Sequence, residues 1–178
     1  MNFQNKVVWI TGASSGIGRA LAIELSSQNA LLIISARNKA SLEAVKIACI
    51  NQENVWVLPL DLEAHSTFTK ITAGAIQIYG RIDILVNNGG ISQRSLVKDT
   101  LVAVDKKIME VNYTGTVGLT KAVLLYFLEQ KQGQVVVTTS IVGLIGTPLR
   151  SSYAASKHAL HGFFDSLRAE VYDHNIDV

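Results

Sequence analysis

Apolar residues recur along the chain in two alternating patterns. Short runs rich in β-branched and other apolar residues occupy 6–10, 30–36, 54–60, 82–87 and 134–140. These runs are nearly continuous in apolar residues, which is typical of strands covered on both faces, as in a parallel sheet. They therefore predict five buried parallel strands.

Stretches with helical periodicity lie between the runs, near 16–28, 39–52, 64–79, 103–130 and 149–173. The last of them carries an apolar stripe, at spacings of three and four, that includes Leu160, Phe164 and Leu167. Strand alternating with helix predicts right-handed βαβ units. We expect an α/β fold, a Rossmann-like doubly wound parallel sheet flanked by helices on both faces.

The C-terminus of the chain is unusual for such a fold. The chain stops at "NIDV" (175–178), where the pattern requires another strand. A strand broken off after three residues is an unusual end for a domain. No repeat or linker interrupts the pattern, so we predict a single domain over 1–178, with the sixth strand only begun and the C-terminal part missing.

Composition and charge narrow the function classes. The chain is 48% hydrophobic with a formal net charge of +2, and its basic residues do not cluster, so nucleic acid is not an expected partner. Cys49 is the only cysteine, which favours a cytoplasmic protein without disulfides. No apolar run reaches about 18 residues, so no membrane span is expected. His158 and His161 lack a carboxylate or cysteine cluster, so no metal is expected and a structural or interface role is favoured.

A glycine-rich turn follows the first strand directly, in "TGASSGIGRA". Gly12, Gly16 and Gly18 occupy the turn from strand to helix. Glycines there allow a tight turn and a close approach of backbone N–H groups to a pyrophosphate, to which the helix N-terminus adds its partial positive charge. Glycines also simply make turns, and the spacing differs from the common Gly-x-Gly-x-x-Gly fingerprint. The position after strand one favours dinucleotide binding.

The end of the second strand, "SARN", indicates which dinucleotide. An acidic residue about 20 positions beyond the glycine turn would bind the ribose hydroxyls of NAD. Arg37 holds this place instead, with Lys39 close by. A guanidinium suits the additional 2′-phosphate of NADP, so we expect NADP(H). The alternative is a solvated arginine at a strand end.

Five motifs then occur in order along the whole chain. They are "TGASSGIG" (11–18), "NNGG" (87–90), "VNYTG" (111–115), Ser140 in "TTSIVG" and "YAASK" (153–157). With them, the chain resembles the short-chain dehydrogenase/reductase (SDR) family in its NADP-preferring form. Family members are longer, so the resemblance also points to a C-terminally truncated chain.

The resemblance implies a set of site residues. The implied pyrophosphate loop consists of Gly12, Ser14, Ser15, Gly16, Ile17 and Gly18. Arg37 would contact the 2′-phosphate, and Asp61 and Leu62 would border the adenine. Asn88 and Gly89 would border the ribose. The implied catalytic tetrad is Asn112, Ser140, Tyr153 and Lys157. Tyr153 and Lys157 would also contact the nicotinamide ribose side of the cofactor. Gly89 departs from the family, which usually has alanine there, and adds backbone freedom.

Tyr153 and Lys157 also carry a chemical argument of their own. Four residues apart, they are neighbours on one helix face. An unperturbed phenol has a pKa near 10, and a nearby ammonium favours the phenolate. Tyr153 is thus expected to be the general acid in reduction and the base in oxidation. The alternative is two amphipathic side chains on a helix surface.

Ser140 and Asn112 complete the expected site. Ser140 ends the fifth predicted strand, at the sheet edge where open α/β folds bind ligands, and can donate to the substrate oxygen. Asn112 and the nearby Gly115 break a helix-forming stretch, which favours either a functional site or a helix kink. By resemblance, Asn112 would hold a water that links Lys157 to solvent.

We therefore expect an NADP(H)-dependent oxidoreductase that acts on a small-molecule carbonyl or secondary alcohol. A sensor or scaffold that binds NADP(H) is the alternative, although a pure binder needs no poised proton donor. Epimerase or dehydratase chemistry is disfavoured by the short route from Ser140 to Tyr153 and by the compact length.

A homodimer is expected through helices 103–130 and 149–173, as in the family. The apolar stretch 123–128 and the pair Phe163 and Phe164 exceed what one inward stripe needs. Two flanking segments are expected to matter less. "SQRS" (92–95) could face the active-site mouth, but a solvated loop is the preferred prediction, and "TPLRS" (147–151) is predicted to form one wall of the pocket.

Overall fold

The computed structural model describes residues 2–178 and contains a six-stranded, fully parallel sheet. The strands are β1 (Val7–Thr11), β2 (Leu31–Ser35), β3 (Val55–Val57), β4 (Ile84–Asn87), β5 (Gly133–Val137) and β6 (Ile176–Asp177). Their order across the sheet is β3-β2-β1-β4-β5-β6. The doubly wound fold is confirmed, and β6 is begun as two residues paired with Gly133 and Gln134.

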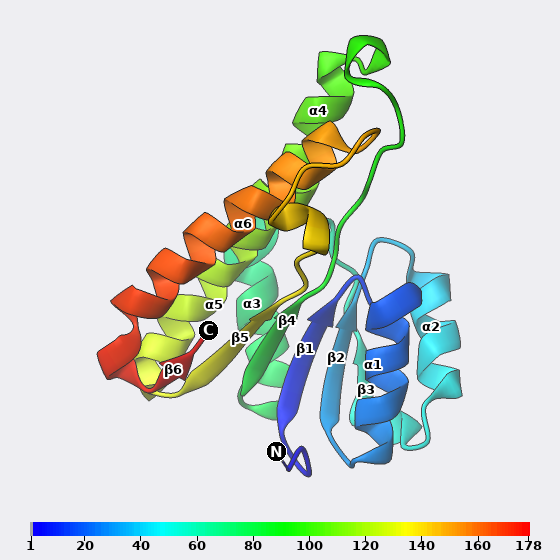
Figure 1. Cartoon of the computed structure of the whole chain (residues 1–178). Coiled ribbons are helices and arrows are strands. Elements are labelled where there is room, and N and C mark those ends of the chain that lie inside the picture. Colours follow the sequence, from blue (N-terminus) through cyan, green and yellow to red (C-terminus); the bar gives the residue numbers. More distant parts are fainter. Residues whose placement is uncertain (1) are drawn as a thin grey trace.

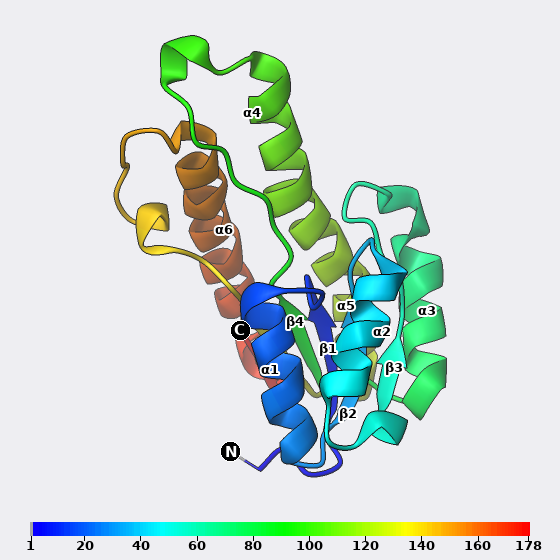
Figure 2. The same cartoon turned by 90° about the vertical axis from the view of Figure 1, so that its right-hand side faces the viewer.

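Helices cover both faces of this sheet (Figures 1 and 2). One face packs on α1 (Gly16–Ser27) and α2 (Lys39–Ala48), and the other on α3 (Phe68–Tyr79), α5 (Thr116–Gln130) and α6 (Ser151–Glu170). Along β1, the side chains of Val8 and Ile10 pack on the face covered by α1 and α2, whereas those of Val7 and Trp9 pack on the opposite face. This alternation of side chains is why the strands read as continuous apolar runs.

Two strands end earlier than predicted, at the edge where the site forms. The predicted strands 54–60 and 134–140 end at Val57 and Val137. Beyond β3, Leu58 N and Leu60 N still donate to the carbonyls of Ile34 and Ala36 on the β2 side, and Pro59 lies between them. The residues after both strands therefore leave the sheet at its carboxyl edge.

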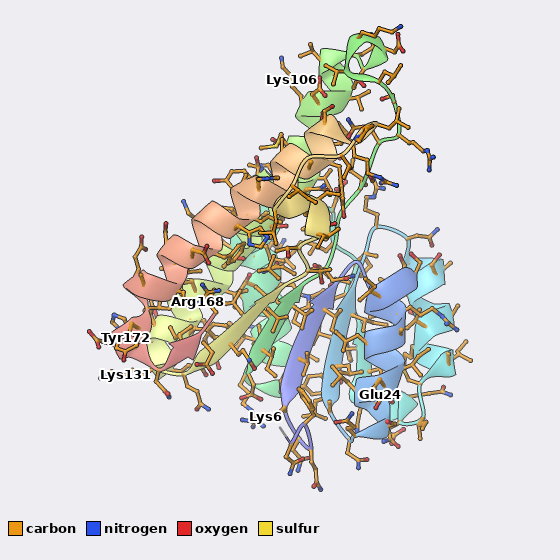
Figure 3. The ribbon with its side chains drawn as sticks, in the orientation of Figure 1. Lys6, Glu24, Lys106, Lys131, Arg168 and Tyr172 are labelled. Atoms are coloured by element: carbon orange, nitrogen blue, oxygen red, sulfur yellow. The ribbon has the colours of Figure 1, made fainter. Side chains whose placement is uncertain are left out.

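The predicted helix 103–130 is one continuous helix with a widened turn. It consists of α4 (Val102–Met109), a π-helical turn η4 (Glu110–Gly115) and α5. Asn112 lies in the widened turn, so the local break takes the form of a π turn. The α4 part extends beyond the sheet, as the position of Lys106 in Figure 3 shows. Short 3₁₀ turns complete the chain at η1 (Gln52–Asn54), η2 (His65–Thr67), η3 (Val97–Asp99), η5 (Ile141–Gly143) and η6 (Tyr172–His174).

The apolar surface of α5 and α6 differs in part from the prediction. Phe164 was assigned both to the apolar stripe and to an exposed patch; it is 5% exposed and belongs to the core with Leu160 and Leu167, so the stripe is confirmed and the patch loses Phe164. Phe163 is half-buried, edge-on to Tyr113 with ring centroids 6.3 Å apart. Leu125 on α5 is 65% exposed and is the large apolar side chain that remains outside.

Two further findings concern the surface and the histidines. Within residues 2–178, no helix has the length and apolar character needed to cross a bilayer. The His158 ring bonds the carbonyl of Ala154 at 2.8 Å, one turn earlier in α6.

Candidate active site

A cleft of about 520 Å³ opens at the carboxyl edge of the sheet. Its walls come from the ends of β1 to β5 and from the start of α6, which is where open α/β folds bind ligands. Eleven of the predicted site residues line it: Gly12, Ser14, Ser15, Ile17, Arg37, Asp61, Leu62, Asn88, Gly89, Tyr153 and Lys157. Gly16, Gly18, Asn112 and Ser140 do not line the cleft.

The glycine turn is packed tightly against the turn after β4. Gly12 has φ +64°, and a Cβ there would lie 2.6 Å from the Cα of Gly89. A Cβ at Gly18 would lie 2.4 Å from the carbonyl oxygen of Gly12. Both contacts are to backbone, which cannot move aside cheaply, so side chains are excluded at these positions. Gly18 therefore acts behind the cleft wall, by letting α1 pack close to the turn.

Asn88 connects three strand ends. Its Nδ2 donates to the carbonyl oxygens of Thr11 and Gly12, each at 3.2 Å, and its Oδ1 accepts from Thr138 Oγ1 at 3.2 Å. Thr11 Oγ1 in turn accepts from the backbone N–H groups of Asn88 and Gly89, each at 3.0 Å. The residue expected to border the ribose thus also fixes the glycine turn to β4 and β5.

Gly89 leaves room for a specific neighbour. A Cβ at this position would lie 2.7 Å from Leu62 Cδ1. The sequence suggested added backbone freedom, but Gly89 is absent from the residues with positive φ. The departure from alanine is therefore explained by the bulk of Leu62, which is 9% exposed and reaches into that space.

Arg37 lines the cleft just beyond the end of β2, and its guanidinium charge is not paired with a carboxylate of the described residues. The side chain is exposed and lines the cleft just after β2. Across residues 2–178, no carboxylate oxygen comes within 4.0 Å of its guanidinium. Asn38 beside it caps α2 by accepting from Ser41 N at 3.0 Å. The cap made by Asn38 thus fixes the backbone next to Arg37. The guanidinium of Arg37 forms no ion pair within residues 2–178.

Lys157 is buried beside Tyr153. It is 5% exposed, and its Nζ donates to the carbonyl oxygen of Thr138 at 2.7 Å. The Nζ atom lies 5.7 Å from the centroid of the Tyr153 ring. Burial disfavours the ammonium and lowers the pKa of Lys157 to about 8. At neutral pH the charge is therefore retained, close to the phenol.

Asn112 is fully buried and bridges two segments of the site. Its Oδ1 accepts from Ile91 N at 2.7 Å, and its Nδ2 donates to Ile91 O at 2.8 Å and to Ser156 Oγ at 3.0 Å. A Cβ at Gly90 would lie 3.2 Å from Asn112 Oδ1 and 3.9 Å from Lys157 Nζ. The side chain thus fixes the segment after β4 to α6, immediately behind Lys157.

Ser140 follows β5 by three residues rather than ending it. It is half-buried, it is the N-cap of η5, and its Oγ accepts from Val142 N at 3.4 Å. The turn that it caps packs against α6, since a Cβ at Gly143 would lie 3.0 Å from Lys157 Cβ. Ser140 therefore belongs to the turn that abuts the Tyr153 and Lys157 helix.

Sequence reasoning missed a polar network on this side of the site. The "SQRS" stretch was predicted to be a solvated loop, but Gln93 is 9% exposed and Ser92 lines the cleft. Gln93 Oε1 accepts from Tyr153 N at 3.1 Å, and its Nε2 donates to the hydroxyls of Ser151 and Ser152. The prediction was wrong because polar residues in a connecting segment carry no periodic signal for burial.

The cleft fits a dinucleotide. Ser15 is the N-cap of α1 without a side-chain cap bond, so the first N–H groups of that helix have no side-chain acceptor. Ser14, Ser15 and Ile17 line the cleft beside this helix start. A glycine turn, an uncapped helix start and a cleft at the switch between β1 and β4 define the class, a doubly wound dinucleotide-binding fold.

The chain belongs to the short chain dehydrogenase family, whose sequence profile matches residues 6–178. This is an oxidoreductase family that uses a nicotinamide cofactor and acts on small molecules. The chain is 52% identical, over 170 residues, to human dehydrogenase/reductase SDR family member 7. That match covers 93% of the chain and 50% of the human protein, so the chain spans about half the length of this curated relative.

Solved structures of the family have the same fold. Levodione reductase superposes with a TM-score of 0.92 at 30% identity, over 98% of this chain and 69% of that one. A family member from Burkholderia phymatum in complex with NAD has a TM-score of 0.92 at 23% identity, over 99% of this chain and 64% of that one. The second likeness shows the fold alone.

Proposed function

We propose that the protein is an NADP(H)-dependent oxidoreductase that interconverts a carbonyl compound and a secondary alcohol. One observation carries the proposal: Tyr153 lines the cleft with the buried ammonium of Lys157 5.7 Å from its ring centroid. A sensor that only binds cofactor would need no such pair. Residues of the glycine turn, Asp61 and Asn88 would hold the cofactor along the cleft.

The chain's own residues supply the proton chemistry. A nicotinamide cofactor, when bound, supplies or accepts the hydride. As a carbonyl is reduced, the C=O π pair moves onto the oxygen and forms the new O–H bond with the phenolic proton of Tyr153, whose own O–H pair stays on the phenolate oxygen. Lys157 stabilises the resulting phenolate by its charge, and Thr138 O holds the ammonium in place by accepting a hydrogen bond from Lys157 Nζ. The proposal assigns the second hydrogen bond to the substrate oxygen to Ser140, which does not line the cleft but lies in the turn packed against the Tyr153 helix.

Replacing the phenol tests this role. In the full-length protein, Tyr153→Phe should lower kcat for NADPH-dependent reduction of an aryl ketone by about 100-fold or more, with NADPH affinity within about threefold. Tyr113→Phe is the matched control, since Tyr113 packs on Phe163 outside the cleft, and it should retain activity. Unchanged turnover in Tyr153→Phe would refute the assignment.

The preference for NADP(H) rests on Arg37. Its guanidinium forms no ion pair within residues 2–178, lies where an acidic residue would bind the ribose of NAD, and suits a 2′-phosphate. NADPH should bind more tightly than NADH in a fluorescence titration. Arg37→Ala should weaken NADPH by about 10- to 100-fold and leave NADH unaffected. Lys39→Ala, which removes a neighbouring exposed cation, should have a small effect, and equal losses in both variants would contradict a specific contact.

We also propose a homodimer through α5 and α6. Leu125 is 65% exposed on α5, an exposure that dimerisation would remove. Leu125→Glu should halve the mass by light scattering. Leu144→Glu, which is equally 65% exposed but follows η5, is the matched control and should leave the mass unchanged. A monomeric wild-type protein would contradict the dimer, and location in the cytoplasm stays a prediction.

A further inference from the structure

Arg150 lies beside the cleft, at the start of the helix that carries Tyr153, although it is not among the residues that line the cleft. It is half-buried at the N-cap position of α6, and its NH1 donates to Ser92 Oγ at 2.6 Å. Its guanidinium carbon lies 5.8 Å from the centroid of the Tyr153 ring. Ser92 and Tyr153 both line the cleft, so the guanidinium lies next to two of the lining residues.

The charge of Arg150 has no counter-ion in the part of the chain that the structure describes. No carboxylate oxygen there lies within 4.0 Å of it. The nearby carboxylate of Asp105 accepts a hydrogen bond from Ser152 instead. A guanidinium has five N–H donors, and this one makes a single side-chain hydrogen bond, to Ser92. Its remaining N–H donors are therefore available to an anion.

The backbone before Arg150 is held in an unusual conformation. Leu149 has φ +68°, in the left-handed region that a leucine rarely adopts because its Cβ crowds the following carbonyl oxygen. Its carbonyl accepts from Ser95 N at 3.2 Å, which fixes it to the segment after β4. Strain of this kind persists where the surroundings over-determine it and is concentrated at ligand sites. Here it sets the direction in which the chain enters Arg150.

We propose that Arg150 is a specificity-determining residue that binds a carboxylate of the substrate; this inference rests on the proposed function. The planar guanidinium can bind a carboxylate with two parallel hydrogen bonds. The carbonyl to be reduced lies at the phenol of Tyr153, and the guanidinium lies near the same ring. The carboxylate is therefore a few bonds from the carbonyl, and the preferred substrates are keto acids and the matching hydroxy acids.

The position of Arg150 distinguishes it from the cations assigned to other tasks. Arg37 lies after β2, at the end of the cleft proposed for the 2′-phosphate. Lys157 lies one turn after Tyr153 in α6, whereas Arg150 lies one turn before it. Arg94 is exposed in the same connecting segment as Ser92, and its side chain makes no hydrogen bond within residues 2–178. Arg94 therefore serves as the matched control.

The test compares a keto acid with its ester in the full-length protein. With NADPH, 4-oxo-4-phenylbutanoate should be reduced with a kcat/KM at least about 10-fold above that of its methyl ester. Arg150→Gln should lower kcat/KM for the acid by about 10- to 100-fold and change the ester by less than about threefold. Arg94→Gln should preserve the preference. Equal reduction of acid and ester by the wild type, or equal losses for both in Arg150→Gln, would overturn the inference.

A binding measurement separates this inference from the proposed function. 4-Phenylbutanoate has the carboxylate but no carbonyl, so its binding to the NADP⁺-loaded protein requires no turnover. Its dissociation constant should rise by about 10-fold or more in Arg150→Gln, and Ser92→Ala should retain most of the affinity. An unchanged constant in Arg150→Gln, or a loss in Ser92→Ala as large as in Arg150→Gln, would contradict anion binding by Arg150. Failure to reduce any ketone, with this binding intact, would instead refute the oxidoreductase proposal.

Discussion

The two halves of the cleft are held together in different ways. In the cofactor half, main-chain atoms close positions Gly12 and Gly18 to any side chain, and the short side chains of Thr11 and Asn88 bond mainly to backbone groups of the same turn. In the substrate half, side chains hold one another, with Gln93, Arg150 and Lys157 each bonded to residues far away in the sequence. A backbone contact constrains residue identity severely, whereas a side-chain network can be rewired. The cofactor half is therefore the rigid part and the substrate half the adaptable one.

The largest expected effect is the loss of a glycine in the cofactor half. In Gly18→Ala the new Cβ would meet Gly12 O at 2.4 Å, so the free energy of unfolding should fall by about 3 kcal/mol. Gly162→Ala in α6 is the control, because a Cβ there meets nothing within 4 Å, and it should stabilise by about 0.5–1 kcal/mol. Urea unfolding measures both, and equal stabilities would show that the turn is not close-packed.

The buried cation of the substrate half should appear in the pH dependence of stability. The pKa of Lys157 is about 8 when folded and near 10.4 when unfolded, so the unfolded chain binds more protons between these values. Stability contributed at this site therefore rises with pH across that window. The free energy of unfolding of wild type relative to Lys157→Met should rise by about 1.4 kcal/mol per pH unit there. A difference that stays constant from pH 7 to pH 10 would mean that Lys157 is not desolvated.

Removal of one side-chain connector should have a smaller effect on stability. Gln93→Leu loses the bonds to Ser151, Ser152 and Tyr153 N, and should lower the free energy of unfolding by about 1–2 kcal/mol. Ketone reduction should fall as well, because Tyr153 loses its support. Gln77→Leu, at an exposed position of α3, is the control for the same chemical change. If the Gln93 variant were as stable and as active as this control, the hydrogen bonds of Gln93 would not support Tyr153 or the fold.

The smallest effect is expected where the cofactor half tolerates adjustment. Gly89→Ala brings a methyl group to 2.7 Å from Leu62 Cδ1, the movable end of a side chain, so it should cost less than about 1 kcal/mol. Leu62→Val shortens that side chain, so the double variant should recover the loss of the alanine. A double-mutant cycle of unfolding free energies measures the coupling. Simple additivity would show that the two residues are independent.

The sequence predicted the fold and much of the site because both depend on local patterns. Continuous apolar runs with intervening helical periodicity predicted every strand, and the glycine turn and Arg37 follow strands directly. The same reasoning could not foresee the burial of Gln93 or the pairing of Arg150 with Ser92. Those contacts join residues 58 to 60 positions apart, and no local pattern encodes them.

Periodicity alone did not distinguish a buried stripe from an exposed patch at Phe163 and Phe164, or a functional site from a kink at Asn112. Phe163 and Phe164 are adjacent, and the sequence suggested that both add to an exposed surface, but Phe164 completes the buried stripe. Asn112 was expected either at a functional site or at a kink. The structure places it in a π turn and gives it three hydrogen bonds to segments that the local sequence does not contain.

The π turn has a geometric consequence for the long helix that contains it. A helix advances about 100° per residue, and a π turn accommodates one additional residue without ending the helix. The turn at 110–115 therefore changes the rotational phase between α4 and α5. As a result, α4 can face α6 while Leu119, Val123 and Phe127 of α5 face the sheet. One continuous helix can therefore pack against both α6 and the sheet. The change of phase falls in the π turn that contains Asn112.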